Sequence, residues 1–122
     1  MQLTLDERNS PLLIRALGDG KIRIADTTYD HSIVITAAGV HDHWPVTAVA
    51  DLLPEHWAPV LEESPSILLL GTGTTLEFPE PAQTAMLAVR RIGVEVMDTA
   101  AACRTFNVLL SEGRSVAAAI II

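Results

Sequence analysis

The hydrophobic pattern is most regular in the second half of the chain. Residues 67–70 form an unbroken aliphatic run, which is typical of a strand buried on both faces. Two segments with apolar residues at helical spacing follow. The first leads into a predicted strand, VEVM at 94–97, and the second into an apolar run at 116–122. Residues 65–122 are therefore predicted to form a βαβαβ unit, with helices packed on a mostly parallel sheet.

Each predicted helix has its own boundary signals and apolar stripe. Pro81 suits the first turn of the first helix, and Gly93 is expected to end it. Asp98 or Thr99 suits the N-cap of the second helix, and Gly113 its end. The stripe of the first helix consists of Ala82, Ala85, Met86, Val89 and Ile92. The stripe of the second consists of Ala102, Cys103, Phe106, Leu109 and Leu110.

The first half of the chain has weaker signals. Residues 1–18 are predicted to form an arm, and residues 19–64 a β-hairpin followed by an irregular region. The hairpin is expected to pair KIRIA (21–25) with HSIVIT (31–36). The complete prediction for residues 1–122 is a single three-layer α/β domain around a central mixed, mostly parallel sheet. Within that sheet Glu95 indicates an edge position for its strand, while residues 116–122 are expected in the interior.

Composition and charge narrow the class of protein. The chain has 122 residues, of which 49% are hydrophobic and 19% charged, a balance typical of one packed globular domain. The net charge is -7 and no basic cluster exceeds Arg90–Arg91, which argues against nucleic-acid binding. A single cysteine, the absence of a secretory or transit pattern and apolar runs too short for a membrane span predict a soluble, cytoplasmic protein.

The Gly71-Thr72-Gly73 segment resembles the start of a phosphate-binding loop. Leu76 stands where a dinucleotide fingerprint has its third glycine, and no P-loop lysine follows. The next helix signal begins only near Pro81, too late for a helix N-terminus to face a phosphate at the glycines. We therefore predict no nucleotide cofactor and interpret both glycines as turn formers with positive φ. A small ligand beside Asp98 remains an alternative, although Asp98 also suits a simple N-cap.

Other reactive side chains give no complete catalytic or metal-binding pattern. His41 and His43 flank Asp42, but no further ligand has a recognisable spacing, so no metal site is predicted. Cys103 lies within an apolar stripe and is expected to be an inert thiol. Trp44 is a contact anchor if exposed and a core residue if buried.

Two polar residues of the second predicted helix lie beside its apolar stripe. Thr105 and Asn107 are each about 100° from Phe106 around the helix, at the two margins of the stripe. Polar groups in such positions can bond neighbouring segments, which is the role expected for both.

The segments LLLGTG, GVEVMDT, CRTFN and EGRSVAAAI occur in the order of a known family. In these segments the chain resembles the small family that includes mitochondrial complex I assembly factor three and short bacterial proteins. The resemblance implies a three-layer α/β fold around a mixed sheet, with no established catalytic residue or cofactor. The signature positions that match are Gly71, Thr72, Gly73, Glu95, Asp98, Thr99, Thr105, Asn107 and Arg114.

These observations lead to two hypotheses about function. The first is a non-enzymatic assembly or protein-interaction factor with a protein partner, which the resemblance connects with subunits of respiratory membrane complexes. The alternative is a small-molecule-binding protein or enzyme that uses the Gly71–Gly73 loop and Asp98. The candidate functional surface consists of Gly71, Thr72, Gly73, Asp98, Thr99, Thr105, Asn107 and Trp44. The oligomeric state is left open.

Overall fold

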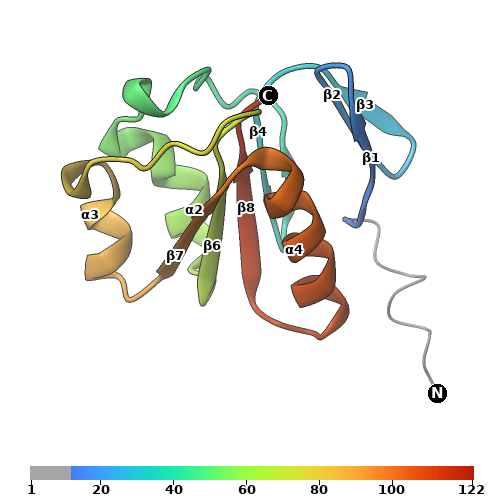
Figure 1. The fold of residues 1–122 in the computed structure, drawn as a ribbon. Coiled ribbons are helices and arrows are strands. Elements are labelled where there is room, and N and C mark those ends of the chain that lie inside the picture. The colour runs from blue at the N-terminus through green and yellow to red at the C-terminus, as the bar shows by residue number, and fades with distance from the viewer. Residues whose placement is uncertain (1–11) are drawn as a thin grey trace.

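The computed structural model describes residues 12–122, which form an α/β fold with two β-sheets (Figure 1). The smaller sheet consists of β1 (Ile14–Gly18), β2 (Lys21–Ile24) and β3 (Thr27–Tyr29). The larger sheet consists of β4 (Ile33–Thr36), β5 (Gly39–His41), β6 (Ile67–Gly71), β7 (Gly93–Met97) and β8 (Val116–Ile120). The helices are η1 (Val49–Asp51), η2 (Pro54–Trp57), α2 (Ala58–Glu63), α3 (Pro81–Val89) and α4 (Thr99–Ser111), where η denotes a 3-10 helix.

The larger sheet has the strand order β5-β4-β8-β6-β7. Strand β6 pairs in parallel with β7 and β8, while β4 pairs antiparallel with β8 and β5. The sheet is mixed, as predicted, but the expectation of a mostly parallel sheet is wrong. The edge position of β7 and the interior position of β8 are confirmed, and Glu95 is exposed on the edge strand.

The predicted hairpin between 21–25 and 31–36 is wrong. Strand β2 pairs with β1 and β3 in the smaller sheet, whereas β4 belongs to the larger sheet. Both strands have the alternating or aliphatic pattern of β-structure, so the strands themselves were recognisable. The turn was misplaced because the chain reverses at Ala25 and Asp26, where Ala25 has a φ of 53°. Alanine gives no sequence signal for such a left-handed conformation.

Alternate side chains of the central strands fill two separate cores. Leu68 and Leu70 of β6 pack with Trp57 of η2 and Leu87 of α3 on one face of the sheet. Leu69 packs with side chains of α4 and of the smaller sheet on the other face. This alternation follows from the two-residue period of a strand. The sheet therefore lies between two layers, with α2 and α3 on one side and α4 and the smaller sheet on the other (Figure 1).

The two long helices match their predictions to different degrees. The stripe of α4 is confirmed, with Phe106 fully buried, and Asp98 is its N-cap. The stripe predicted for α3 is wrong, because Val89 is 80% exposed and Leu87 is the buried residue of this helix. Helix α3 also ends at Val89 rather than at Gly93, and Arg91 adopts a left-handed φ of 61°.

The arm predicted for residues 1–18 forms a strand in its last five residues. Strand β1 starts at Ile14, whose N–H donates to Asn107 Oδ1 and whose carbonyl accepts from Asn107 Nδ2, both at 2.8 Å. The expectation that Asn107 bonds a neighbouring segment is thus confirmed. Residues 1–11 of the arm lie outside the described residues. Between residues 12 and 122, no helix combines the length and the apolar character that crossing a membrane requires.

Candidate functional site

The Gly-Thr-Gly loop, residues 71–73, directs its amides into the protein. The Thr72 N–H donates to the Met97 carbonyl at 3.0 Å, and the Gly73 N–H donates to Thr99 Oγ1 at 2.8 Å. The Gly73 carbonyl in turn accepts from the Thr99 N–H at 2.9 Å. A phosphate-binding loop presents free amides to its ligand. Because these two amides have partners within the fold, the loop lacks that arrangement.

Glycine is required at the two positions of this loop for different structural reasons. Gly73 has a φ of 101°, which fits the prediction of a turn that requires glycine. The same prediction is wrong for Gly71, which has no positive φ. A Cβ atom at Gly71 would lie 3.0 Å from Thr99 Oγ1 and 3.1 Å from the Ala102 Cβ. Glycine at position 71 therefore permits the close approach of α4 to the end of β6.

Thr72 and Thr99, two of the three threonines of the candidate surface, are buried, and both hydroxyls are hydrogen-bonded. Thr99 Oγ1 donates to the Ile121 carbonyl at 2.7 Å while it accepts from Gly73, so one hydroxyl connects β6, α4 and the end of β8. Thr72 Oγ1 donates to the Thr75 carbonyl at 2.7 Å and accepts from the Glu77 N–H at 3.2 Å. Both hydroxyls serve the fold, because buried hydroxyls are stable only when they are hydrogen-bonded.

Asp98 is half-buried and Oδ1 accepts from the Ala101 N–H at 2.8 Å, the geometry of an N-cap. A groove of about 380 Å³ opens beside it, between the β1–β2 turn, Gly73 and the residues after β8. We call this the loop groove. Asp19 and Asp98 supply its acidic groups, and no lysine or arginine contributes to the lining that the described residues provide. The part of the loop groove that residues 12–122 form therefore presents no cationic side chain to a phosphate.

The remaining candidates lie elsewhere. Trp44 is 5% exposed and its indole N–H donates to the His56 carbonyl at 2.8 Å, so of the two alternatives Trp44 is a core residue. Thr105 is half-buried on α4, and Asn107 holds β1.

Cys103 is buried in the stripe of α4, and burial raises the pKa of its thiol to about 11. The thiol is accordingly a poor nucleophile.

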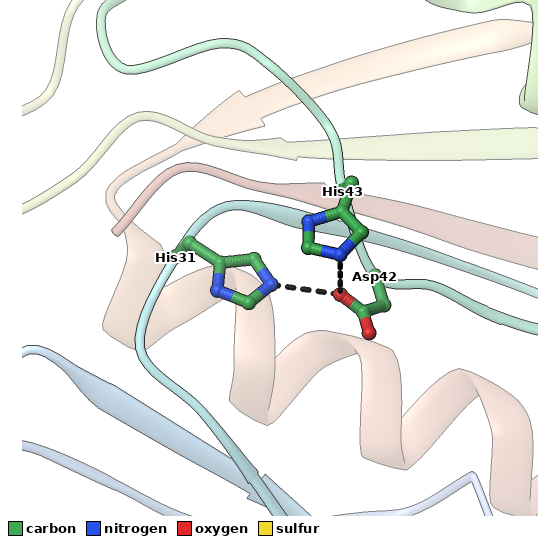
Figure 2. A group of neighbouring side chains, drawn as sticks. All are labelled: His31, Asp42 and His43. Atoms are coloured by element: carbon green, nitrogen blue, oxygen red, sulfur yellow. Dashed lines mark hydrogen bonds and ion pairs between the residues drawn. The ribbon is translucent and has the colours of Figure 1, made fainter.

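The side chains of His31, Asp42 and His43 lie close together, as Figure 2 shows. This group was not predicted from the sequence. His31 Nε2 lies 2.9 Å from Asp42 Oδ1, and His43 Nε2 lies 3.5 Å from the same oxygen. The two imidazole rings stack with centroids 5.1 Å apart and planes 10° from parallel. We call His31, Asp42 and His43 the histidine cluster.

The β4–β5 hairpin explains why the histidine cluster forms. Val34 faces His41 in its register, so the residues just before β4 and just after β5 come together. The sequence reading paired His41 with His43, but His41 is not part of the cluster. The missed signal was the position of the turn at Ala37 and Ala38. Continued beyond the strands, the register set by this turn places Ser32, the neighbour of His31, opposite His43.

A second carboxylate supports the cluster. Asp30 Oδ1 lies 3.0 Å from His31 Nδ1, so both ring nitrogens of His31 face a carboxylate. The hydrogen bond with Asp42, followed by that with Asp30, raises the pKa of His31 above its usual 6.5. The hydrogen bond to His31 lowers the pKa of Asp30 below 3.8. The cluster thus combines imidazole and carboxylate donors near the surface.

With the fold and these geometries described, the comparison with known proteins identifies the family. The family described as protein of unknown function (DUF498/DUF598) matches residues 14–121. The chain belongs to the DUF498/DUF598 family. The resemblance seen in the sequence motifs is therefore confirmed.

Relatives of this DUF498/DUF598 protein differ in length and in name. An assembly factor 3 of the NADH dehydrogenase [ubiquinone] 1 alpha subcomplex from Bos taurus is 39% identical over 80 residues, covering 64% of this chain and 44% of that protein. The chain spans between 30% and 46% of the assembly factors it matches. A 13 kDa major membrane protein from Francisella tularensis is 25% identical over 122 residues, which is 99% of both chains.

Solved structures share the fold over most of its length. A Mth938-like domain from Bordetella pertussis is 31% identical and has a TM-score of 0.82, with 99% of this chain and 92% of that chain covered. A structure described as an outer membrane protein from Bartonella henselae is 38% identical and has a TM-score of 0.81, with 90% and 93% covered. The DUF498/DUF598 chain thus has the Mth938-like α/β fold.

Proposed function

We propose that this protein is a non-enzymatic assembly or protein-interaction factor. The observation that carries the proposal is the likeness to assembly factor 3 proteins, which reaches 47% identity over 55 residues in the Xenopus tropicalis relative. The matched family is otherwise described only as one of unknown function. The partner that this likeness favours is a subunit of a respiratory membrane complex.

Exposed apolar side chains around α3 supply a surface for such a partner. Phe78 is 70% exposed in the loop before α3, and Val89 is 80% exposed at the end of this helix. The other members are Leu53, Leu76 and Met86. We call these residues the α3 surface; Leu53 immediately precedes η2, which packs on α3. Exposed apolar and aromatic side chains are the usual anchors of protein interfaces.

Polar contacts hold helix α3, which carries Met86 and Val89 of this surface, against neighbouring segments. The Gln83 side-chain amide donates to the carbonyls of Val49 and Leu52 at 2.9 and 3.0 Å, which ties α3 to the segment around η1. The Trp57 indole N–H donates to the Gln83 carbonyl at 2.7 Å. A preordered apolar surface loses less conformational entropy on binding, which favours association.

A matched pair of valine substitutions tests the proposal. Val89→Asp places a charge on the α3 surface, whereas Val108→Asp makes the same change at a 55% exposed site on α4. We expect Val89→Asp to lower co-purification of a respiratory-complex subunit from the native host at least tenfold and Val108→Asp to leave it unchanged. Equal recovery with both variants, or no recurrent subunit with the unaltered protein, contradicts the proposal. Thermal melting of both variants checks that each is folded.

The location within the cell belongs to the same proposal. The sequence predicts a cytoplasmic protein, while a Francisella tularensis relative is named a major membrane protein. Both fit a protein that reaches the membrane through a partner. We expect Val89→Asp to move the protein from the membrane fraction to the cytosol, and retention of this variant on washed membranes would oppose this account.

A second candidate function rests on the loop groove. Its volume of about 380 Å³ lies within the range of small-molecule sites. Asp19 and Asp98 favour a neutral or cationic ligand over a phosphate. Ala100→Trp would fill the groove from the start of α4, so a metabolite that raises the melting temperature of the unaltered protein but not of Ala100→Trp would support this candidate.

A further inference from the structure

We propose that His31, Asp42 and His43 form a binding site for a divalent transition-metal ion such as zinc, with a coordination position left open toward the adjoining groove. The site is independent of the protein-interaction function proposed above. The first argument is the donor set, which contains two imidazole nitrogens and one carboxylate oxygen. Zinc binds these donors, and three protein ligands plus one open position is a common arrangement.

The spacing of the donor atoms supports the site. A tetrahedral zinc ion with bonds of about 2.0–2.1 Å separates its ligand atoms by about 3.3 Å. Asp42 Oδ1 already lies 2.9 Å from His31 Nε2 and 3.5 Å from His43 Nε2. All three donor atoms lie within 4.8 Å of one another. The third edge of the triangle, between the two imidazole nitrogens, is therefore at most 4.8 Å, and His43 is the exposed ring whose movement would shorten it.

Asp30 provides the support that metal-bound histidines usually have. Its Oδ1 lies 3.0 Å from His31 Nδ1, on the opposite side of the ring from Asp42. With the Nδ1 proton shared with Asp30, Nε2 is the His31 nitrogen left for a metal, and it faces Asp42 (Figure 2). A carboxylate that orients a histidine in this way also increases its basicity as a ligand.

The backbone next to each histidine is fixed. His31 precedes Ser32, which is 4% exposed, and His43 precedes the buried Trp44. The Trp44 N–H donates to the Ser32 carbonyl at 3.3 Å, and Ser32 Oγ accepts from the Ile122 N–H at 3.2 Å. These contacts hold the two histidine-bearing segments side by side. Such a frame limits the reorganisation that metal binding requires.

The groove beside the cluster leaves room for a further ligand at the open coordination position of the proposed metal ion. His31 and His43 both line a groove of about 350 Å³, which also includes Trp44 and Thr47. A metal held by the three side chains has room there for water or for a donor from another molecule. The carboxylates of Asp30 and Asp42 balance the charge of a divalent ion. Because the groove lining within residues 12–122 includes no lysine or arginine, it adds no cationic side chain that would oppose the ion.

Zinc titration of the full, untagged chain by calorimetry tests the site. We expect one zinc ion per chain, with affinity lowered at least tenfold by His31→Gln, Asp42→Asn or His43→Gln. His41→Gln is the matched control, because His41 lies on β5 beside the cluster but outside it. It is expected to retain affinity within twofold. Asp30→Asn removes only the supporting carboxylate and is expected to lower zinc affinity about tenfold.

Two results would overturn the site. One is the absence of stoichiometric zinc binding to the unaltered chain at millimolar zinc; the other is zinc affinity that His31→Gln leaves unchanged. Cobalt binding to the unaltered protein and to His41→Gln is a second test, which does not depend on the folding of the ligand variants. Its visible absorption bands should appear in the unaltered protein and in His41→Gln, and their absence from both contradicts the proposal. Melting temperatures without metal identify any variant that is unfolded.

Discussion

The Gly-Thr-Gly loop and the histidine cluster border two grooves that share Ile122, yet their polar groups are used in opposite ways. At the loop, the Gly73 amide donates to Thr99 Oγ1 of α4, and the Thr72 and Thr99 hydroxyls donate to backbone carbonyls. In the cluster, side chains from separate segments bond one another near the surface. The Gly-Thr-Gly motif therefore has a structural role. The better set of metal-binding side chains comes from the histidine cluster, which has no sequence motif.

The largest expected effect tests the structural role of the loop. Thr99→Val preserves the shape of the side chain but removes the hydroxyl, leaving the Ile121 carbonyl and the Gly73 N–H without this partner. A buried carbonyl and a half-buried N–H without this partner predict a loss of about 2–4 kcal/mol in the free energy of unfolding, measured with urea. Thr105→Val on the same helix is the control, with a small change expected. If Thr99→Val changes the free energy of unfolding by less than about 0.5 kcal/mol, the hydrogen bonds of Thr99 are not important for stability.

A second prediction tests the close approach of α4 at Gly71. Gly71→Ala adds a Cβ within 3.0–3.1 Å of Thr99 and Ala102, so it should destabilise the fold by about 1–3 kcal/mol through overpacking. Gly93→Ala is the matched control on β7, where the added Cβ would meet the Ser66 carbonyl oxygen at an ordinary 3.5 Å. The measurement is again urea unfolding of both variants. Equal stability of the two variants would contradict the close approach of α4 to β6.

The smallest effect concerns the protonation of the histidine cluster. The hydrogen bonds to Asp42 and Asp30 raise the pKa of His31 above 6.5, so an NMR titration should find it above that value and Asp42→Asn should lower it. A raised pKa in the folded state contributes stability below the unfolded pKa, and this contribution is lost as pH rises through the folded pKa. The melting temperature should therefore fall slightly as pH rises above 6.5, and less so in His31→Gln. An NMR pKa at or below 6.5 would contradict the geometry of the cluster.

The sequence predicted the second half of the fold well because its signals are local. The aliphatic run of β6, the N-cap at Asp98 and the stripe around Phe106 each specify an element without knowledge of the rest. The stripe of α3 was wrong because this helix packs through Leu87 and the polar Gln83. A pattern of hydrophobic residues cannot reveal contacts that depend on an amide group.

The first half was harder to predict because its pairing is nonlocal. Strand β4 pairs with β8, and β1 is held by Asn107, residues that are far apart in the sequence. The histidine cluster was hidden for a different reason: its members meet through the local β4–β5 hairpin, whose turn at Ala37 and Ala38 was not predicted. The candidate loop was visible as a motif, but its hydrogen bonds, which decide its role, were not.

The measurement that tests the proposed function most directly is site-specific photo-crosslinking in the native host. A photoreactive phenylalanine analogue replaces Phe78 on the α3 surface in one variant and Val108 on α4 in the other. We predict that the Phe78 variant yields one recurrent crosslinked product containing a respiratory-complex subunit and that the Val108 variant does not. The absence of any such product from the Phe78 variant, or its equal yield from both positions, would contradict an assembly factor that binds through the α3 surface.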